Sequence, residues 1–428
     1  MHGLYRFVSV KPAELRALLY SFAYFFCLLC GYYVLRPVRD EMGIQGGVEN
    51  LQWLFTATFI AMLCAVPVFG WASSRFARAK LLPMVYGFFI FNIVLFYFLS
   101  RSQLVPPQYL ARVFFVWVSV FNLFVVSVFW SFMVDLFDSE QARRLFGFIA
   151  AGGSAGAVAG PTLTSLLVGA LGPINLLLVS ALFLGLALLC VYRLRGWARQ
   201  QQQAVSEALG GGIFDGIRRV LQSPYLLGIC TYVLLYTMIS TFLYFTQAEI
   251  IRDAFTESSD RTRIFAMMDL VTNGLTIGLQ IFVTGRIAQR WGLPVMLVLV
   301  PAIVIVGFVV LSFYPVLIVL VCVQVLRRAG NYAIARPGRE MLFSVLARAD
   351  KYKSKNFVDT VVYRGGDAVS GWVYAGLAAL GMMASGIAAV GTVVAAVWLA
   401  IGWQLGQARR RLEPVDARNP ITPVQVGR

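Results

Sequence analysis

The chain has 428 residues, of which 59% are hydrophobic and only 13% are charged, whereas roughly a quarter of the residues in a soluble domain are charged. So much apolar surface excludes a water-soluble fold. The net charge of +16 does not indicate a nucleic-acid partner, because the basic residues are scattered between apolar stretches and form no single basic face.

Twelve apolar stretches follow one another along the chain. At 1.5 Å per residue, a helix of about 20 residues crosses the ~30 Å hydrocarbon core of a bilayer, so each stretch predicts a transmembrane helix surrounded by membrane lipids. In chain order the stretches are 17–35, 51–71, 81–99, 113–135, 146–168, 174–191, 225–245, 264–283, 293–313, 315–335, 357–380 and 387–405. They predict an all-α membrane protein.

A polar stretch, 193–223, divides the twelve predicted helices into two groups of six. It contains four consecutive glutamines and three consecutive glycines, a composition typical of a linker. The sequence therefore predicts a six-helix bundle over 1–192, a cytoplasmic linker over 193–223, a second six-helix bundle over 224–408 and a cytoplasmic tail over 409–428.

The distribution of Lys and Arg predicts the orientation in the membrane. With both termini in the cytosol, 26 of the 36 basic residues fall in cytosolic segments, seven in the opposite loops and three inside helices. Cytosolic loops carry the excess of Lys and Arg, so we expect cytosolic termini. The first apolar stretch is too long for a cleaved signal peptide, which favours a multi-pass protein of the cell inner membrane of a bacterium.

Local features recur at one offset, which indicates that the two halves are duplicates. The dipeptide Arg39-Asp40 recurs as Arg252-Asp253, and Gly152-Gly153 recurs as Gly365-Gly366, each 213 residues later. Internal repeats of this kind are common in transporters. The two bundles are therefore expected to be pseudo-symmetric.

Two loops, 70–78 after the second stretch and 285–292 after the eighth, are short and basic. This organisation resembles the major facilitator superfamily, although Ser74 and Gln289 stand where the loop motif of that family has aspartate. The resemblance implies a secondary transporter that works by alternating access. The run 156–161 is similar to the G-x-x-x-G-P element of exchangers, and Gly152 precedes it at the same spacing. Close helix packing is sufficient to explain these glycines.

Three further stretches resemble the ATP/ADP translocases, the nucleotide exchangers of obligate intracellular bacteria and plastids. The stretches are 32–40, 129–147 and 336–359. The resemblance implies exchange of a nucleotide or another phosphorylated anion. Two departures, Arg336 where the translocases have aspartate before proline and Asp367 near their lysine, indicate a divergent member and leave the cargo open.

Several charged residues fall inside predicted spans, and four of them are candidates for substrate binding. Arg327 and Arg328 lie in the tenth span, and Arg364 and Asp367 share one face of the eleventh. A charge inside a bilayer costs ~2.5 to 3.5 kcal/mol on insertion scales, so each is expected to face a polar cavity or a partner. Because the planar arginine fork suits phosphate, we predict that these four residues bind an anionic small-molecule substrate. For Arg364 and Asp367, an ion pair within the helix is the alternative.

Other charged residues are predicted to assist transport. Arg36 and Arg39 follow the first span, and we expect them at the outer mouth of the cavity as further substrate-binding residues. The candidates for ion coupling or for gate salt bridges are Asp135, Asp269, Arg336, Glu340 and Lys355.

Several functions are not predicted. No G-x-x-x-x-G-K-[ST] motif occurs and the only histidine is His2, so we expect no ATP-driven pumping, no catalysis and no metal or other cofactor. Two alternatives to an exchanger stay open. One is a proton- or cation-coupled transporter of another small solute, and the other is a non-transporting membrane sensor or assembly factor. We expect a monomer.

Overall fold

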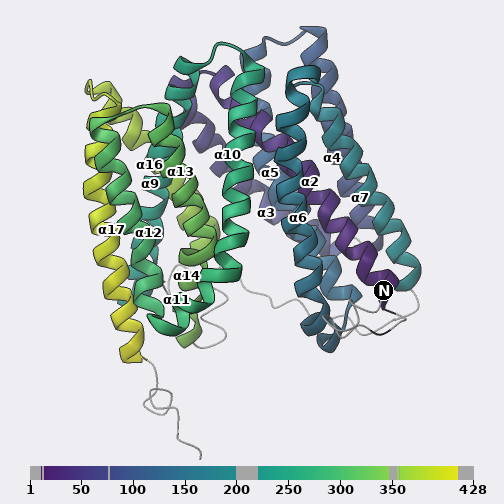
Figure 1. Cartoon of the computed structure of the whole chain (residues 1–428). Coiled ribbons are helices and arrows are strands. Elements are labelled where there is room, and N and C mark those ends of the chain that lie inside the picture. Colours follow the sequence, from purple (N-terminus) through teal and green to yellow (C-terminus); the bar gives the residue numbers. More distant parts are fainter. Residues whose placement is uncertain are drawn as a thin grey trace, which may run out of the picture. The chain divides into compact units, whose positions relative to one another are not determined.

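A computed structural model describes residues 11, 14–75, 78–198, 220–346, 354–355 and 357–412 of the chain. Over these residues the backbone forms helices joined by short turns, and no strand occurs (Figure 1). The helices of the first half are α2 (Leu15–Gln45), α3 (Leu51–Arg75), α4 (Arg78–Ser102), α5 (Pro107–Leu136), α6 (Ser139–Leu171) and α7 (Leu176–Ala198).

The second half is also helical, and three π-helical turns interrupt it. Its helices are α9 (Pro224–Ala254), α10 (Ser258–Leu279), α11 (Gly285–Arg290), α12 (Gly292–Phe313), α13 (Leu317–Gly330), α14 (Arg336–Leu342), α16 (Tyr363–Ala379) and α17 (Ala384–Leu412). The π turns are Gln280–Thr284, Asn331–Ala335 and Val358–Val362. Such turns are rare and occur often at functional sites.

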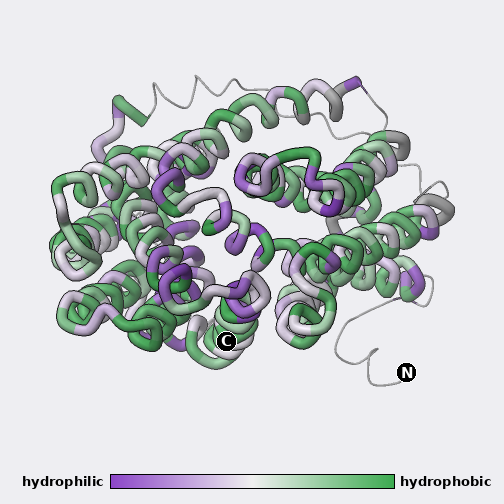
Figure 2. Tube along the Cα trace, turned by 90° about the horizontal axis from the view of Figure 1, so that it is seen from above, coloured by the Kyte–Doolittle hydropathy of each residue, from purple (hydrophilic) through white to green (hydrophobic). Residues whose placement is uncertain are grey.

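Eleven helical segments of the described residues are long and apolar enough to cross a membrane. Seen from above, much of the helical trace is hydrophobic, with hydrophilic residues interspersed (Figure 2). The eleven segments correspond to every predicted span except 357–380. That stretch is nonetheless helical, because the third π turn leads directly into α16, and it carries Asp359, Arg364 and Asp367.

Several helices continue past the ends that hydropathy predicted. The first span was expected to end at residue 35, but α2 ends at Gln45. Arg36 and Arg39 therefore lie inside a helix, and their predicted position in a loop is wrong. The helix continues because its last polar side chains bond to other helices, as described below.

The described residues group into two compact units that do not follow the two halves of the sequence. Unit 1 comprises Met1–Leu209, Tyr244–Ile277 and Gly371–Gly376. Unit 2 comprises Gly210–Leu243, Gly278–Ser370 and Leu377–Arg428. Helices α9, α10 and α16 thus contribute to both units. The division into bundles over 1–192 and 224–408 follows the duplication and stays a prediction.

In unit 1, α2 packs against α5, α6 and α7. Glycines on α6 make the closest approach, as the sequence predicted. A Cβ atom at Gly156 would lie 2.9 Å from the backbone nitrogen of Cys30, and one at Gly160 would lie 2.7 Å from the Cβ of Tyr33. Small residues allow two membrane helices to pack backbone against backbone, so these positions fix how near α6 comes to α2.

Unit 2 contains a similar contact between α16 and α9. A Cβ atom at Gly366 would collide with the hydroxyl of Thr237 and would lie 3.0 Å from the side chain of Leu234. Gly152-Gly153 and Gly365-Gly366 are the dipeptides that recur 213 residues apart. Close glycine contacts in both copies agree with a duplication.

Gly156→Ala is expected to lower the melting temperature of the purified protein by several degrees. The added methyl group must push α2 and α6 apart, at an overpacking cost of about 1–3 kcal/mol. Gly147→Ala on the same helix is the control, because nothing lies within 4 Å of a Cβ atom there. Both variants gain the same helix propensity. Equal melting temperatures for the two variants would contradict the close packing of α6 on α2.

Candidate functional site

A first group of charged residues lies where α2 ends and α10 begins, within unit 1. Arg36 forms an ion pair with Asp269 of α10, with 3.5 Å between Nη1 and Oδ1, and the Asp269 side chain is only 2% exposed. Arg36 also lies over the ring of Tyr33, 5.7 Å from its centroid. The structure thus brings together one predicted substrate residue and one predicted gate residue.

Arg39 is neutralised by its neighbour in sequence. Its Nε and Nη2 atoms donate to Oδ1 of Asp40 at 3.0 and 2.6 Å. The same carboxylate oxygen accepts a hydrogen bond from the hydroxyl of Tyr244 on α9, at 3.0 Å. The guanidinium lies over the ring of Phe115, 4.9 Å from its centroid, so Arg39 is held from several sides.

The best-formed ion pair of this group joins Glu41 of α2 to Arg261 of α10. Two parallel bonds connect them, at 2.7 Å from Nε and 2.9 Å from Nη2, and the Glu41 side chain is 2% exposed. Such two-pronged contacts between arginine and carboxylate are the strongest protein ion pairs. Sequence analysis did not identify Glu41, because hydropathy ended the first helix before it.

A backbone hydrogen bond links α6 to α10 in the same unit. The carbonyl of Ala157 would normally accept from the amide four residues later, but that residue is Pro161, which has no N–H. Nδ2 of Asn273 on α10 donates to this carbonyl instead, at 2.6 Å. The proline of the G-x-x-x-G-P element therefore creates an acceptor for a helix of the second half.

A second group lies inside unit 2, around Arg327 of α13. This side chain is 3% exposed, and its Nε and Nη2 atoms donate to Oε1 of Gln324 at 3.0 and 2.8 Å. Among the described residues, its Nη1 atom has no hydrogen-bond partner. The guanidinium lies 5.9 Å from the centroid of the Tyr236 ring. Arg328, the next residue, is also buried.

Arg364 and Asp367 of α16 belong to the same group. They form an ion pair within the helix, with 3.5 Å between Nη1 and Oδ2, and the Asp367 side chain is 15% exposed. Arg364 lies over the Tyr363 ring, whose centroid is 5.8 Å from that of Tyr236. Two aromatic rings therefore connect Arg327 with the pair on α16.

The remaining predicted residues of the second half are Arg336 and Glu340 of α14 and Lys355, which precedes the third π turn. Glu340 pairs with Lys355 at 2.5 Å. Next to them, Arg339 pairs with Asp359 at 3.2 Å, a pair that sequence analysis did not identify. Arg336 is exposed. In the first half, Asp135 near the end of α5 is also exposed.

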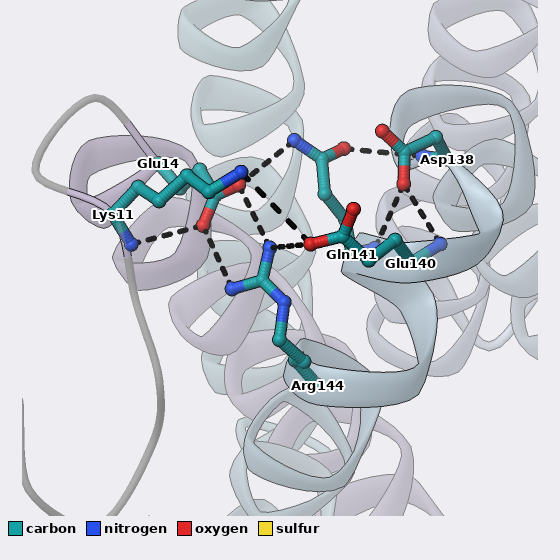
Figure 3. Close-up of polar contacts among 6 residues, drawn as sticks. All are labelled: Lys11, Glu14, Asp138, Glu140, Gln141 and Arg144. Atoms are coloured by element: carbon teal, nitrogen blue, oxygen red, sulfur yellow. Dashed lines mark hydrogen bonds and ion pairs between the residues drawn. The ribbon is translucent and has the colours of Figure 1, made fainter.

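A third polar cluster ties the start of α2 to the start of α6 (Figure 3). Glu14 accepts hydrogen bonds from the Lys11 amide and the Gln141 side chain, both at 3.0 Å, and from Arg144 at 3.1 and 3.3 Å. Asp138 caps α6 through the amides of Glu140 and Gln141. Burial favours the neutral Glu14, but the bonds from Arg144, Lys11 and Gln141 outweigh it and lower the pKa of Glu14 below its usual value.

Comparison with known proteins now identifies the family. A sequence profile of the Major Facilitator Superfamily matches residues 11–348. The chain belongs to the Major Facilitator Superfamily. It is therefore a multi-pass membrane transporter of the secondary kind, with an all-α fold, as the sequence predicted. Family and fold are those of transporters, not of enzymes.

Solved structures of other facilitators share this fold. A bacterial homologue of the human lysosomal transporter Spinster, inward-facing and unoccupied, is 14% identical, with a TM-score of 0.61. The match covers 96% of this facilitator and 100% of that chain. An auto-inhibited POT-family peptide transporter is 12% identical, with a TM-score of 0.65 and coverage of 95% and 99%. The nucleoside transporter NupG is 13% identical, with a TM-score of 0.61 and coverage of 94% and 100%. No curated protein sequence matches this facilitator.

Removing one partner of the Glu41–Arg261 pair is expected to destabilise this facilitator strongly. Arg261→Gln leaves the buried Glu41 carboxylate without its counter-charge, which costs about 3–5 kcal/mol, and the melting temperature should fall accordingly. Replacing both partners by glutamine should be less harmful than replacing Arg261 alone.

Arg263→Gln is the control for that measurement. Arg263 pairs with Asp260 at 3.7 Å, and both side chains are about half exposed. Exposed pairs contribute roughly 0–1 kcal/mol, so this variant should melt close to the wild type. A loss as large as that of Arg261→Gln would contradict the special role of the buried pair.

The Glu14 cluster should make stability depend on pH. A carboxyl group whose pKa is lowered by folding stabilises the protein above its usual pKa and loses that effect as the pH falls through its folded-state pKa. Glu14→Gln should therefore lower the melting temperature at neutral pH. The gap to the wild type should narrow as the pH falls below about 4.5. A gap that stays constant over this range would exclude ionised Glu14 as the cause.

Proposed function

We propose that this facilitator exchanges phosphorylated, nucleotide-like anions across a bacterial inner membrane by alternating access, as a monomer with cytosolic termini. The main support for the proposal is the burial of Arg327 and the nature of its hydrogen-bond partner. Its guanidinium is almost completely buried, and its two hydrogen bonds go to a neutral amide oxygen. A buried cation that lacks a carboxylate within bonding distance is costly unless a ligand supplies the negative charge.

The ligand best suited to this position is an anion with several oxygens. Gln324 already occupies Nε and Nη2 of Arg327, so an incoming oxygen would bind Nη1, which has no partner among the described residues. Arg364 offers a second fork beside it, and its contact with Asp367 is long for an ion pair. Phosphate groups accept such bonds readily from arginine.

Aromatic rings next to the arginines support a nucleotide over a simple phosphate. The rings of Tyr236 and Tyr363 lie between Arg327 and Arg364 and could stack on a base. The stretches that resemble ATP/ADP translocases favour the same class of substrate. The likeness to the nucleoside transporter NupG, at 13% identity, concerns the fold alone.

The ion pairs of unit 1 suit the gate of such a transporter. Arg36–Asp269, Asp40–Tyr244 and Glu41–Arg261 each join α2 of the first half to a helix of the second half. We propose that these contacts break when the substrate path opens at this end. Arg36 would then be released to meet the anion, with Arg39 nearby still paired with Asp40, and Asp269 would act as a gate residue.

Reconstitution in liposomes tests the function. The purified protein should take up labelled ATP, ADP, AMP or inorganic phosphate, and unlabelled anion inside the vesicles should accelerate uptake strongly. Arg327→Gln should reduce the exchange rate at least tenfold, because the buried anion loses its counter-charge. Arg286→Gln is the control, since it removes the same charge from an exposed residue, which donates a hydrogen bond to the Phe282 carbonyl in the preceding π turn.

The same assay separates the alternatives. Uptake that follows a pH gradient and needs no internal anion would support a proton-coupled transporter instead. If no anion moves, or if Arg327→Gln exchanges at the wild-type rate, the proposal of anion exchange is wrong.

A further inference from the structure

We propose that the Arg364–Asp367 pair sets the charge of the anion that the site accepts, with Asp367 taking the place of one negative charge of the substrate. This inference rests on the proposed anion exchange. It adds to that function a specificity-determining role for Arg364 and Asp367.

The Arg364–Asp367 contact is loose in comparison with the ion pairs of unit 1. Its two atoms are 3.5 Å apart at a single contact, whereas Glu41 and Arg261 are joined by two bonds of 2.7 and 2.9 Å. Both partners lie on the same helix, three residues apart, so the pair holds no second helix in place. An ion pair with only a structural role would stabilise the fold more if it had the two short bonds of the Glu41–Arg261 pair.

Asp367 also faces the rest of the cluster. The charged and titratable groups around it are Arg364 on its own helix, Arg327 of α13 across the ring of Tyr236, and Tyr363, which itself lies near Tyr332. The Asp367 side chain is 15% exposed and that of Arg364 is 36% exposed, so water screens these interactions only in part. One carboxylate therefore acts on two arginines, and an anion that binds Arg327 enters its field.

The physical consequence depends on the charge of the substrate. A fixed negative charge in a partly screened site repels an anion in proportion to the charge that the anion carries. Asp367 should thus disfavour highly charged anions more than weakly charged ones, and Arg364 should act in the opposite sense. Removing both residues leaves the net charge of the site unchanged, so the preference should return.

A series of adenine nucleotides tests this inference, because AMP, ADP and ATP share one base and carry increasing negative charge. The full-length protein is reconstituted in liposomes as wild type, Asp367→Asn, Arg364→Gln and the double variant. The ratio of the initial rates of ATP and AMP exchange is measured at mildly alkaline pH, so that the carboxyl groups are ionised, and the ratio for pyrophosphate and phosphate is measured alongside.

The ATP-to-AMP ratio is expected to rise about tenfold in Asp367→Asn and to fall by a similar factor in Arg364→Gln. It should return to within about threefold of the wild-type value in the double variant, because the two electrostatic effects cancel. Asp359→Asn is the matched control: it removes a carboxylate from the same helical segment, but that carboxylate pairs with Arg339. Its ratio should stay at the wild-type value.

Every other result contradicts either the inference or the proposed function. If the single variants change all rates equally and leave the ratio unmoved, or if the double variant does not recover it, the pair is structural and the inference is wrong. If Asp367→Asn does not fold, Arg364→Gln and the double variant still decide between these outcomes. If the wild type moves no anion, the proposed function fails and the inference with it, whereas wild-type flux with constant ratios overturns the inference alone.

Discussion

A bilayer supplies no water to a charged group, and this cost explains where the charges of this facilitator lie. Within unit 1, the charges in the last turns of α2 are matched by opposite charges. Arg36 faces Asp269, Arg39 faces Asp40, and Glu41 faces Arg261. These pairs allow α2 to remain helical well past its apolar stretch. Arg327 in unit 2 differs, because its hydrogen bonds go to a neutral amide.

The same constraint acts on the backbone. Pro161 deprives the carbonyl of Ala157 of its usual donor, and Asn273 supplies one from α10. Beside it, the glycines of α6 bring that helix against the backbone of α2. A stretch that resembles an exchanger motif thus has a plain structural role. It provides a close surface for one helix and an acceptor for another, and the acceptor joins the first half of the chain to the second.

The contrast between the two groups of charges connects structure with transport. Matched pairs between α2 and helices of the second half can form and separate without leaving a net charge, which suits a gate. An arginine that is buried against an amide and an aromatic ring suits a ligand with negative charge. In the proposed exchange, the pairs of unit 1 form the gate and Arg327 binds the anion. The Arg364–Asp367 pair adjusts which anion binds.

Hydropathy was enough to predict an all-α membrane protein and eleven of its spans, because the bilayer imposes a length and a composition that can be counted along the chain. The two halves with their short basic loops pointed to the family. The same features identified the glycines of α6 and the charges within helices at 327, 328, 364 and 367. They could not reveal that Glu41 bonds Arg261, that Asn273 bonds Ala157, or that Arg36 and Arg39 lie inside a helix. Those features depend on residues more than 100 positions away. A membrane helix continues through polar residues only when another helix supplies hydrogen-bond or ion-pair partners for them.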